Sequence, residues 1–323
     1  MPAPPLGPDY LRDFVKTELT RATAPRQRVL LAVSGGLDSM TLWHLAHAAG
    51  LDYAVAHVNY HLRGRDSDAD EALVRATARE RGVVLDVLAN RTLVNATRDR
   101  QRRARDIRYD FFATVRAARG CAATLLAHHA DDQLETQLIG LLQGRGPRAL
   151  AGMNLAAADR WRPLLPYPKT DLRAYAKTHG VGYREDRSNE DGAYLRNRVR
   201  GELADTMKSL SPRLLAHSRR LGDEQRALLV FAEAQARRAL ESARAGESAL
   251  AYRRSALAAL PGLAFVLHTW LRDRGFDRVT VGQIAERIAA GPRAKARYHN
   301  RDRTRELTVA GKYVTLADAP GGE

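Results

Sequence analysis

Short apolar runs alternate with segments of helical periodicity over residues 10–142, and this alternation constrains the fold more than any other feature. The runs predict strands at residues 28–33, 53–58, 83–87 and 124–127. The helical patterns lie at residues 10–19, directly after Ser39, and at 68–81, 98–116 and 132–142. Strands that alternate with helices build a parallel sheet with helices on its faces. The sequence therefore predicts an α/β fold.

The pattern changes near residue 200, where helical periodicity takes over. Serine caps helices and proline suits their first turn, so Ser211-Pro212 should start a helix that continues to about Gly246. Shorter helices are expected around 252–274 and 280–290, and alternation over 296–316 predicts a β-hairpin. A chain of 323 residues suits two domains. We place them at residues 1–205 and 206–323, the second mainly α-helical.

The chain is strongly basic. It carries 52 Lys and Arg against 37 Asp and Glu, a net charge of +15. Such an excess favours a polyanionic partner, often nucleic acid. The alternative is a coding bias towards arginine, since few of the basic residues are lysine.

Cysteine content and hydropathy exclude several classes of protein. The one cysteine, Cys121, rules out a disulfide framework and a multi-thiolate metal site within this chain. No run approaches the ~20 apolar residues that a bilayer span needs, so no membrane partner is expected. The first residues lack a signal-peptide pattern, and we expect a cytoplasmic protein.

A serine- and glycine-rich loop lies between the first apolar run and its helix. Two glycines let the backbone approach an anion, and the helix that follows adds its positive dipole end. The carboxylate of Asp38 would repel phosphates unless it holds Mg²⁺. The alternative is a plain serine–glycine turn before a helix. We predict an ATP phosphate site formed by Ser34, Gly35, Gly36, Leu37, Asp38 and Ser39.

Two further sets of side chains follow strand ends, where ligands of α/β sheets bind. His57 closes the second strand and is either a nucleotide contact or a core residue. Asp132 and Glu135 are three residues apart and should share one helix face, where they could bind Mg²⁺ or an ammonium group. The alternative for the acidic residues is a favourable position at a helix N-terminus.

Arginines gather in a third segment. Arg196, Arg198 and Arg200 suit contacts to phosphate groups, although such a run can also be a solvated helix face.

Taken in order, these segments resemble the tRNA(Ile)-lysidine synthetase family of the ATP pyrophosphatase (PP-loop) superfamily. The resemblance covers about residues 28–200. It rests on Ser34–Ser39, His57–Arg63, Ala104–Tyr109, His128–Thr136, Gly144–Met153, Arg162–Leu165 and Glu185–Asn197. The chain departs from the family pattern at Gln101 and within the 143–150 loop, and it is as long as the short form that lacks an extra C-terminal domain.

The resemblance implies a Rossmann-like, adenine nucleotide alpha hydrolase-like domain followed by a helical tRNA-binding domain. It implies a ligase that joins free L-lysine to C2 of cytidine 34 in tRNA(Ile) with a CAU anticodon, with ATP and Mg²⁺. The implied catalytic residues are Asp38, Asp132, Glu135, Arg105 and Arg196, of which Asp132 and Glu135 bind lysine and Asp38 holds Mg²⁺ with ATP. The implied tRNA contacts are Arg196, Arg198, Arg200, Arg293 and Arg297.

Two other activities of the superfamily stay open as alternatives. One is amidation by another PP-loop ligase, and the other is tRNA 2-thiolation, which generally uses two cysteines. DNA is not expected as a partner, and a homodimer is possible.

Overall fold

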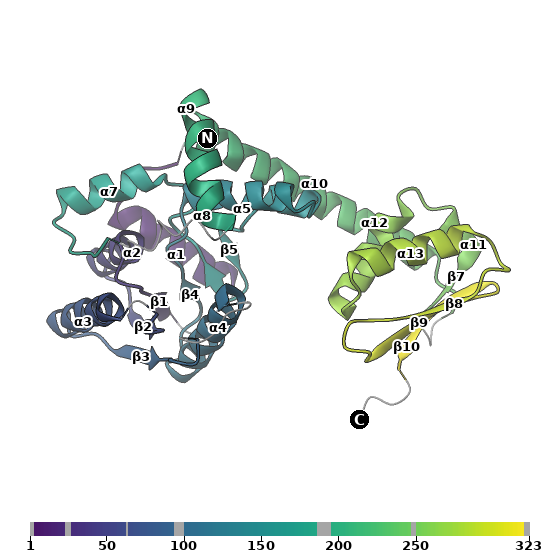
Figure 1. The fold of residues 1–323 in the computed structure, drawn as a ribbon, viewed down its shortest axis with the longest axis horizontal. Helices are drawn as coiled ribbons and strands as arrows, with labels where there is room; N and C mark the ends of the chain where they lie inside the picture. Colours follow the sequence, from purple (N-terminus) through teal and green to yellow (C-terminus); the bar gives the residue numbers. More distant parts are fainter. Residues whose placement is uncertain are drawn as a thin grey trace. The chain divides into compact units, whose positions relative to one another are not determined.

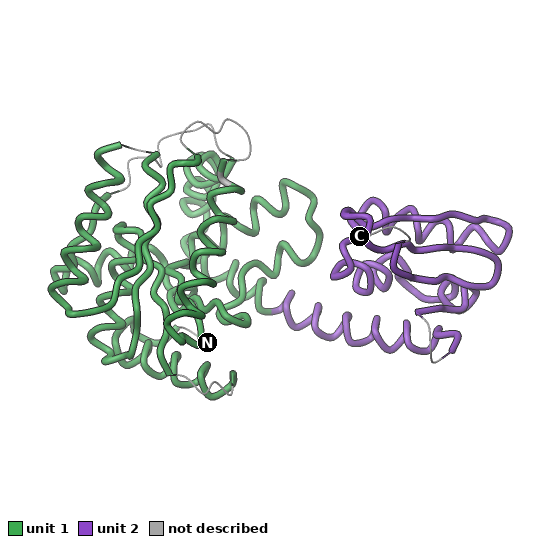
Figure 2. The backbone as a smooth tube through the Cα atoms, turned by 90° about the horizontal axis from the view of Figure 1, so that it is seen from below, with its two compact units in different colours: residues 1–223 green, residues 224–323 purple. Residues whose placement is uncertain are grey.

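The computed structural model describes residues 3–22, 27–62, 64–93, 100–185, 195–246 and 250–319. The chain forms two compact units, residues 1–223 and 224–323 (Figures 1 and 2). The division falls inside one continuous helix, α10 (Leu214–Ser242). The sequence predicts the boundary before this helix, between residues 205 and 206.

Unit 1 is built on a six-stranded sheet with the order β3-β2-β1-β4-β6-β5. Its strands are β1 (Val29–Ala32), β2 (Tyr53–Asn59), β3 (Leu85–Ala89), β4 (Thr124–Leu125), β5 (Ala156–Ala157) and β6 (Arg160–Trp161). All pairs are parallel except β5 with β6. The predicted α/β fold with a parallel sheet is therefore confirmed.

Helices cover both faces of this sheet (Figure 1). The helices of unit 1 are α1 (Pro8–Arg21), α2 (Leu37–Ala48), α3 (Arg65–Glu80), α4 (Arg100–Ala118), α5 (Ala130–Leu142), α6 (Pro147–Ala151), α7 (Lys169–Thr178), α8 (Leu195–Arg198), the π-helical turn η2 (Val199–Ala204) and α9 (Asp205–Leu210). No helix in the described part of the chain is both long and apolar enough to cross a bilayer.

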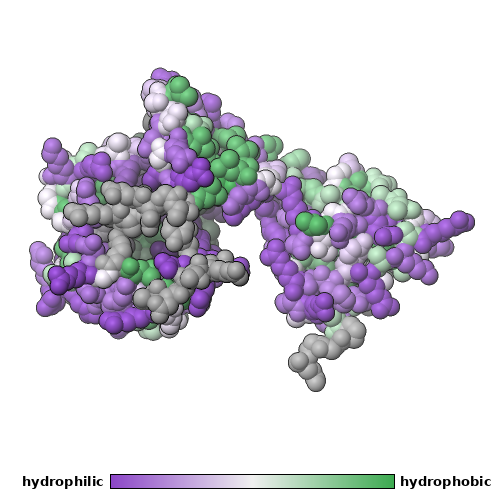
Figure 3. Space-filling view, in the orientation of Figure 1, coloured by the Kyte–Doolittle hydropathy of each residue, from purple (hydrophilic) through white to green (hydrophobic). Residues whose placement is uncertain are grey.

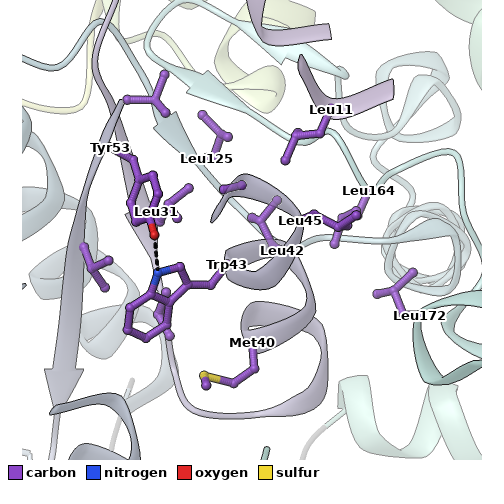
Figure 4. Close-up of a cluster of buried hydrophobic side chains, with 14 of the residues drawn as sticks. Leu11, Leu31, Met40, Leu42, Trp43, Leu45, Tyr53, Leu125, Leu164 and Leu172 are labelled. Carbon is purple, nitrogen blue, oxygen red and sulfur yellow. Dashed lines mark hydrogen bonds between the residues drawn. The ribbon is translucent and has the colours of Figure 1, made fainter. Parts of the chain in front are cut away.

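Successive residues of β1 point to opposite faces, which fixes the two cores. Leu31 joins the larger cluster around Trp43, whose indole N–H donates to the Tyr53 hydroxyl at 3.2 Å (Figure 4). Leu30 joins a second cluster with Phe112 of α4. Burial on both faces explains why the first strands read as continuous apolar runs.

A third cluster connects α5 to the helices that follow residue 195. Leu134 and Leu138 of α5 pack with Val199 and Ala204 of η2. Apolar side chains also reach the surface over α5 and the first part of α10 (Figure 3). This packing places the arginine segment beside the acidic end of α5.

Unit 2 combines helices with a four-stranded antiparallel sheet of order β7-β10-β9-β8. Its elements after α10 are β7 (Ala251–Arg253), α11 (Arg254–Ala258), α12 (Leu263–Leu271), η3 (Arg272–Arg274), α13 (Arg278–Ala289), β8 (Ala296–His299), β9 (Arg305–Ala310) and β10 (Tyr313–Asp318). The helical region is present as expected. The sheet is larger than the predicted hairpin, because β8 and β7 pair on either side of it.

Candidate active site

The loop between β1 and α2 has the geometry of an anion-binding turn. Gly35 has φ +95°, and a Cβ there would lie 3.3 Å from Cβ and the carbonyl oxygen of Asp70. Glycine adopts such a conformation without strain and leaves room for the close approach. Gly36 is the N-cap of α2, whose first N–H groups lack partners within the helix. The loop therefore presents backbone donors and a positive dipole end to an anion.

The two serine hydroxyls of the loop bond to the loop itself. Ser39 Oγ donates to the Gly36 carbonyl at 3.0 Å and accepts from the Ser34 N–H at 3.1 Å. The hydroxyls of Ser34 and Ser39 are 3.1 Å apart. The sequence predicts both serines in a phosphate site; in the structure Ser39 is buried and braces the turn.

Arg184 braces the same turn from a distant part of the chain. Its N–H donates to the Gly35 carbonyl at 3.0 Å, and its Nε donates to Asp70 at 2.9 Å. Its terminal nitrogen also reaches Asp66 at 3.0 Å. We assigned no role to Arg184 from the sequence, because it lies 114 residues from Asp70 and no local pattern links them.

Asp38 lies at the start of α2 between two cationic side chains. Its Oδ2 is 3.5 Å from His129 Nε2 and 3.9 Å from Lys169 Nζ. Its Oδ1 is buried and makes no hydrogen bond. An anionic oxygen without a partner fits a cation ligand, so Asp38 suits Mg²⁺ held jointly with nucleotide phosphates.

His129 precedes α5 and is surrounded by carboxylates. Besides Asp38, its ring nitrogens lie 3.5 Å from Asp131 and 3.5 Å from Asp132. Burial alone would lower the pKa of His129, but the three carboxylates outweigh burial and raise this pKa to about 10. The ring is therefore an imidazolium at neutral pH and supplies a fixed positive charge beside Asp38.

Asp131 anchors two basic side chains on this side of the site. Its carboxylate accepts from the Lys169 N–H at 2.9 Å and pairs with Lys208 Nζ at 3.0 Å. Burial would raise the pKa of Asp131, but His129, the Lys169 N–H and Lys208 lower it below its usual range.

Asp132 and Glu135 share one face of α5, and two arginines form ion pairs with them. Glu135 is only 1% exposed and accepts from Arg196 Nε at 2.8 Å and from Arg200 Nε at 2.5 Å. Asp132 lies 3.5 Å from Arg196 and 3.8 Å from Arg200. The structure therefore brings together the expected lysine-binding pair and two of the expected phosphate-binding arginines.

The charges of this group reinforce one another. Burial raises the pKa of Asp132, but His129, His128 and Arg196 outweigh burial and lower it. Burial lowers the pKa of Arg200, but Glu135 and Asp132 raise it. An aspartate held ionised in this way binds a cation well and takes up a proton poorly.

Arg105 belongs to a neighbouring cluster of cations and rings. Its guanidinium lies 4.8 Å from the centroid of the Tyr109 ring. Burial lowers the pKa of His128; Asp132 raises it, whereas Arg162, Arg196 and Arg105 lower it, and the result is a pKa of about 4. His128 is therefore neutral at pH 7, unlike His129 next to it.

His57 lies at the base of the glycine loop. It is buried, and its Nδ1 is 2.8 Å from the Val33 carbonyl oxygen, one residue before the loop serine. Burial lowers the pKa of His57, so the ring is neutral. Its Nε2 is buried without a hydrogen-bond partner.

The remaining expected contacts are exposed or lie outside the described residues. Arg198 pairs with Glu202 on the exposed side of its helix. Arg293 and Arg297 lie in unit 2, where Arg297 is 3.9 Å from Glu306. Arg63 and residues 186–194 lie outside the described residues.

A buried amide network holds the 143–153 loop against α5. Gln133 Oε1 accepts from the Met153 N–H at 2.7 Å, and Gln137 Nε2 donates to the Leu150 and Ser218 carbonyls. Gly152 has φ +65°, and a Cβ there would lie 2.3 Å from the Gln133 side chain. The glycine and the two amides therefore fix the loop that follows the acidic pair.

A family model described as the PP-loop domain matches residues 11–207. The chain belongs to the PP-loop family. The anion-binding turn at Gly35 and Gly36 lies within these residues.

Curated relatives match more than half of the chain. A protein named tRNA(Ile)-lysidine synthase from Geobacter sulfurreducens is 39% identical over 230 residues, which cover 66% of this chain and 48% of that protein. One of the same name from Exiguobacterium sibiricum is 40% identical over 192 residues, covering 58% and 45%. The chain thus spans about half the length of these relatives.

Among solved structures, a U34-tRNA thiolase from Methanococcus maripaludis with its [4Fe-4S] cluster is similar with a TM-score of 0.52. The match covers 66% of this chain and 79% of that one at 17% identity. At this identity the likeness concerns the fold alone.

Proposed function

We propose that this protein ligates free L-lysine to C2 of cytidine 34 in tRNA(Ile) with a CAU anticodon, at the expense of ATP. The products would be lysidine, AMP and pyrophosphate. The observation that carries the proposal is the acidic pair Asp132 and Glu135 near Asp38, in which Glu135 already accepts from two guanidinium groups at 2.8 and 2.5 Å. The names and 34–40% identities of the curated relatives support the same activity.

The ATP end of the site follows from the loop geometry. The amides around Gly35 and Gly36 would hold the pyrophosphate portion, and Arg184 would keep the turn in shape. Mg²⁺, held by Asp38 with the phosphates, would neutralise the charge of the leaving pyrophosphate. The imidazolium of His129 would orient Asp38 and add positive charge next to it.

The cytidine end requires a bond exchange in two steps. O2 of cytidine 34 attacks the α-phosphorus, and pyrophosphate leaves. The lysine ε-nitrogen then attacks C2, the C2–O2 bond breaks, and AMP departs with that oxygen. The proton that the amine loses passes to the carboxylate pair. Because the pKa of Asp132 is lowered, we assign Asp132 to anchoring and Glu135 to receiving the proton.

Lysine entry would displace an arginine from the acidic pair. A lysine ammonium carries the same charge as the guanidinium it replaces, so the buried Glu135 would never lose its counter-ion. Arg196, once released, could pair with a phosphate of the adenylate or the tRNA. Through this exchange Arg196 could serve both as a catalytic residue and as a tRNA contact, the two roles that the family resemblance implies. Arg105, close to His128, would serve the same anionic groups.

The cysteine content argues against thiolation as the alternative. Cys121 is the one cysteine of the chain, and it is buried in the second cluster of unit 1. A two-cysteine relay cannot form within this chain.

The test is release of AMP from ATP with purified protein, labelled lysine and a tRNA(Ile) transcript of anticodon CAU. We expect AMP and RNA label to rise together and to need all three substrates. Elongator methionine tRNA, which has the same anticodon, serves as the control RNA. Release of AMP without label in the RNA would reject lysine as the nucleophile and favour ammonia in its place.

A matched pair of variants assigns the result to this site. Asp38→Asn should abolish AMP release, whereas Asp171→Asn, an exposed carboxylate in the first turn of α7, should leave it unchanged. Normal AMP release by Asp38→Asn would contradict the role given to Asp38.

A further inference from the structure

The phosphate-binding loop between β1 and α2 has no basic side chain of its own. Its residues Ser34–Ser39 include neither lysine nor arginine, and the two serine hydroxyls bond within the loop. The phosphate loops of ordinary nucleoside triphosphatases carry a lysine directly after their glycines, and this lysine reaches the β- and γ-phosphates. In this protein a comparable full positive charge has to come from another part of the chain.

Lys169 brings an ammonium group to this loop from the first residue of α7, a helix that packs on α2 (Figure 1). Its Nζ lies 3.9 Å from Oδ2 of Asp38. Its backbone N–H donates to Asp131 at 2.9 Å, and two residues earlier the Tyr167 carbonyl accepts from the Ala130 N–H at 2.8 Å. The backbone of this segment is therefore fixed to the start of α5, while the Lys169 side chain is 35% exposed.

The ammonium of Lys169 is poorly matched within the protein. Among the described residues its nearest carboxylate is that of Asp38, and 3.9 Å is too long for a hydrogen bond. Lys208, by contrast, lies 3.0 Å from Asp131 and 2.8 Å from Asp205. An ion pair between partly exposed groups at such a distance contributes little to the free energy of unfolding. Folding therefore does not account for a lysine at this position.

A lysine at the start of α7 also goes against two local preferences. The positive dipole end of a helix favours acidic residues and disfavours cations in the first turn. Arginine is the usual basic residue of this chain, since only six of its 52 basic residues are lysines. An ammonium is a compact point charge, whereas a guanidinium is a wide fork, so a lysine suits a narrow space beside phosphates. Departures from local preference are expected at functional sites.

We propose that Lys169 is a further catalytic residue, whose ammonium binds the β-phosphate of ATP and stabilises the pyrophosphate as it leaves. This inference rests on the proposed function through the cleavage of ATP between its α- and β-phosphates. When O2 of the cytidine bonds to the α-phosphorus, the bond from that phosphorus to the bridging oxygen breaks, and its electron pair stays with pyrophosphate. The ammonium keeps its protons and donates hydrogen bonds to the oxygens on which this charge develops.

Two other anions compete as partners of this ammonium, namely the carboxylate of free lysine and a phosphate of the tRNA backbone. We favour ATP because Nζ lies 3.9 Å from Asp38, the carboxylate to which we assign Mg²⁺ and the nucleotide phosphates. An anion that arrives without Mg²⁺ is repelled by Asp38.

Titration calorimetry of the full chain with magnesium pyrophosphate, in the absence of tRNA and lysine, tests the contact directly. Lys169→Met removes the charge and keeps the length of the side chain, so the Kd for pyrophosphate should rise at least tenfold. The kcat for AMP release with all substrates should fall about 100-fold. Lys177→Met is the matched control, an exposed lysine in the last turn of the same helix, and should change neither value.

Chemical rescue separates the charge from any effect on folding. Lys169→Cys alkylated with 2-bromoethylamine regains an ammonium at nearly the length of lysine, whereas the native Cys121 is buried. The alkylated variant should recover pyrophosphate affinity, and the untreated variant should not. A loss caused by a distorted fold would not be recovered in this way.

The inference is overturned if Lys169→Met binds pyrophosphate as tightly as the wild type, or if alkylation restores nothing. A change confined to the KM for lysine, or to tRNA retention in a filter assay, would also overturn it and assign Lys169 to the lysine carboxylate or to the RNA backbone. Failure of the proposed function is recognised separately. A wild-type chain that binds pyrophosphate through Lys169 but transfers no labelled lysine to RNA would support this inference and reject lysidine formation.

Discussion

Replacing Glu135 with glutamine removes one negative charge from the centre of the candidate site and little else. The side chain keeps its size and one acceptor oxygen. Arg196 and Arg200, which donate to Glu135 at 2.8 and 2.5 Å, then lose this counter-ion, and Asp132 lies 3.5 and 3.8 Å from them. The substitution therefore tests how much the buried carboxylate contributes to folding and to lysine binding.

The size of the effect follows from burial. Removing one partner of a fully buried ion pair costs about 3–5 kcal/mol. Here Glu135 is buried, but the side chains of Arg196 and Arg200 are 37% and 32% exposed, so water and Asp132 offset part of the loss. We expect about 2 kcal/mol, which lowers Tm by about 4–8 °C for a unit of this size.

Two assays separate folding from chemistry. Thermal unfolding of Glu135→Gln gives the change in Tm, and steady-state kinetics with varied lysine give kcat and KM at a temperature where the variant is folded. If the proposed function holds, KM for lysine rises at least tenfold while binding of ATP is unchanged. Glu202→Gln is the matched control, because Glu202 pairs with Arg198 on the exposed side of the same segment.

The control makes the reasoning refutable. If Glu135→Gln and Glu202→Gln lower Tm equally, burial of the ion pairs of Glu135 adds nothing to the free energy of unfolding. An unchanged KM for lysine in Glu135→Gln, with Tm lowered, would make the pair purely structural.

Three further predictions rest on single features of unit 1. The pKa of His129 is raised to about 10, above its unfolded value near 6.5. The free energy of unfolding that His129 adds relative to His129→Gln should therefore be fully present below pH 6.5 and be lost as the pH rises to about 10. Denaturant titrations of both proteins across this pH range, with a chelator present, measure this difference. Gly152→Ala should cost well over 1 kcal/mol in urea unfolding, because its Cβ meets Gln133; Gly180→Ala, with a similar φ but open space, should cost less. Asp38→Asn should still bind tRNA in a filter assay while AMP release is lost, and a parallel loss of both would make Asp38 a structural residue.

The sequence was sufficient for the elements that have a period or a distinct boundary. The first three strands and their helices were located to within a few residues, because a buried parallel sheet produces apolar runs. The short elements gave no such signal. β5 and β6 have two residues each, too few for any pattern, and β7 lies in an alanine- and arginine-rich segment that favours helix. Pairing of Tyr252 with Val314 overrides that local preference.

In the candidate site, the spacing of residues along the sequence predicted which side chains share one helix, but not which side chains of different helices contact each other. Asp132 and Glu135 do share a face of α5, as three-residue spacing requires. That Arg196 and Arg200 reach them depends on contacts 61–65 residues apart. The same limit explains why Arg184 and His129 received no role from the sequence.

The pairing of arginines with the acidic residues has a consequence for any ligand of this site. A guanidinium that binds a carboxylate through two nitrogens cannot bind a phosphate in the same way at the same time. Arg196 and Arg200 lie four residues apart across the start of the π-helical turn η2, so one rotation of this short segment would move both. Under the proposed function, anionic substrates that draw the arginines away would also vacate the carboxylates for lysine. The buried charge of Glu135 thereby makes lysine affinity depend on whether the anionic substrates are present.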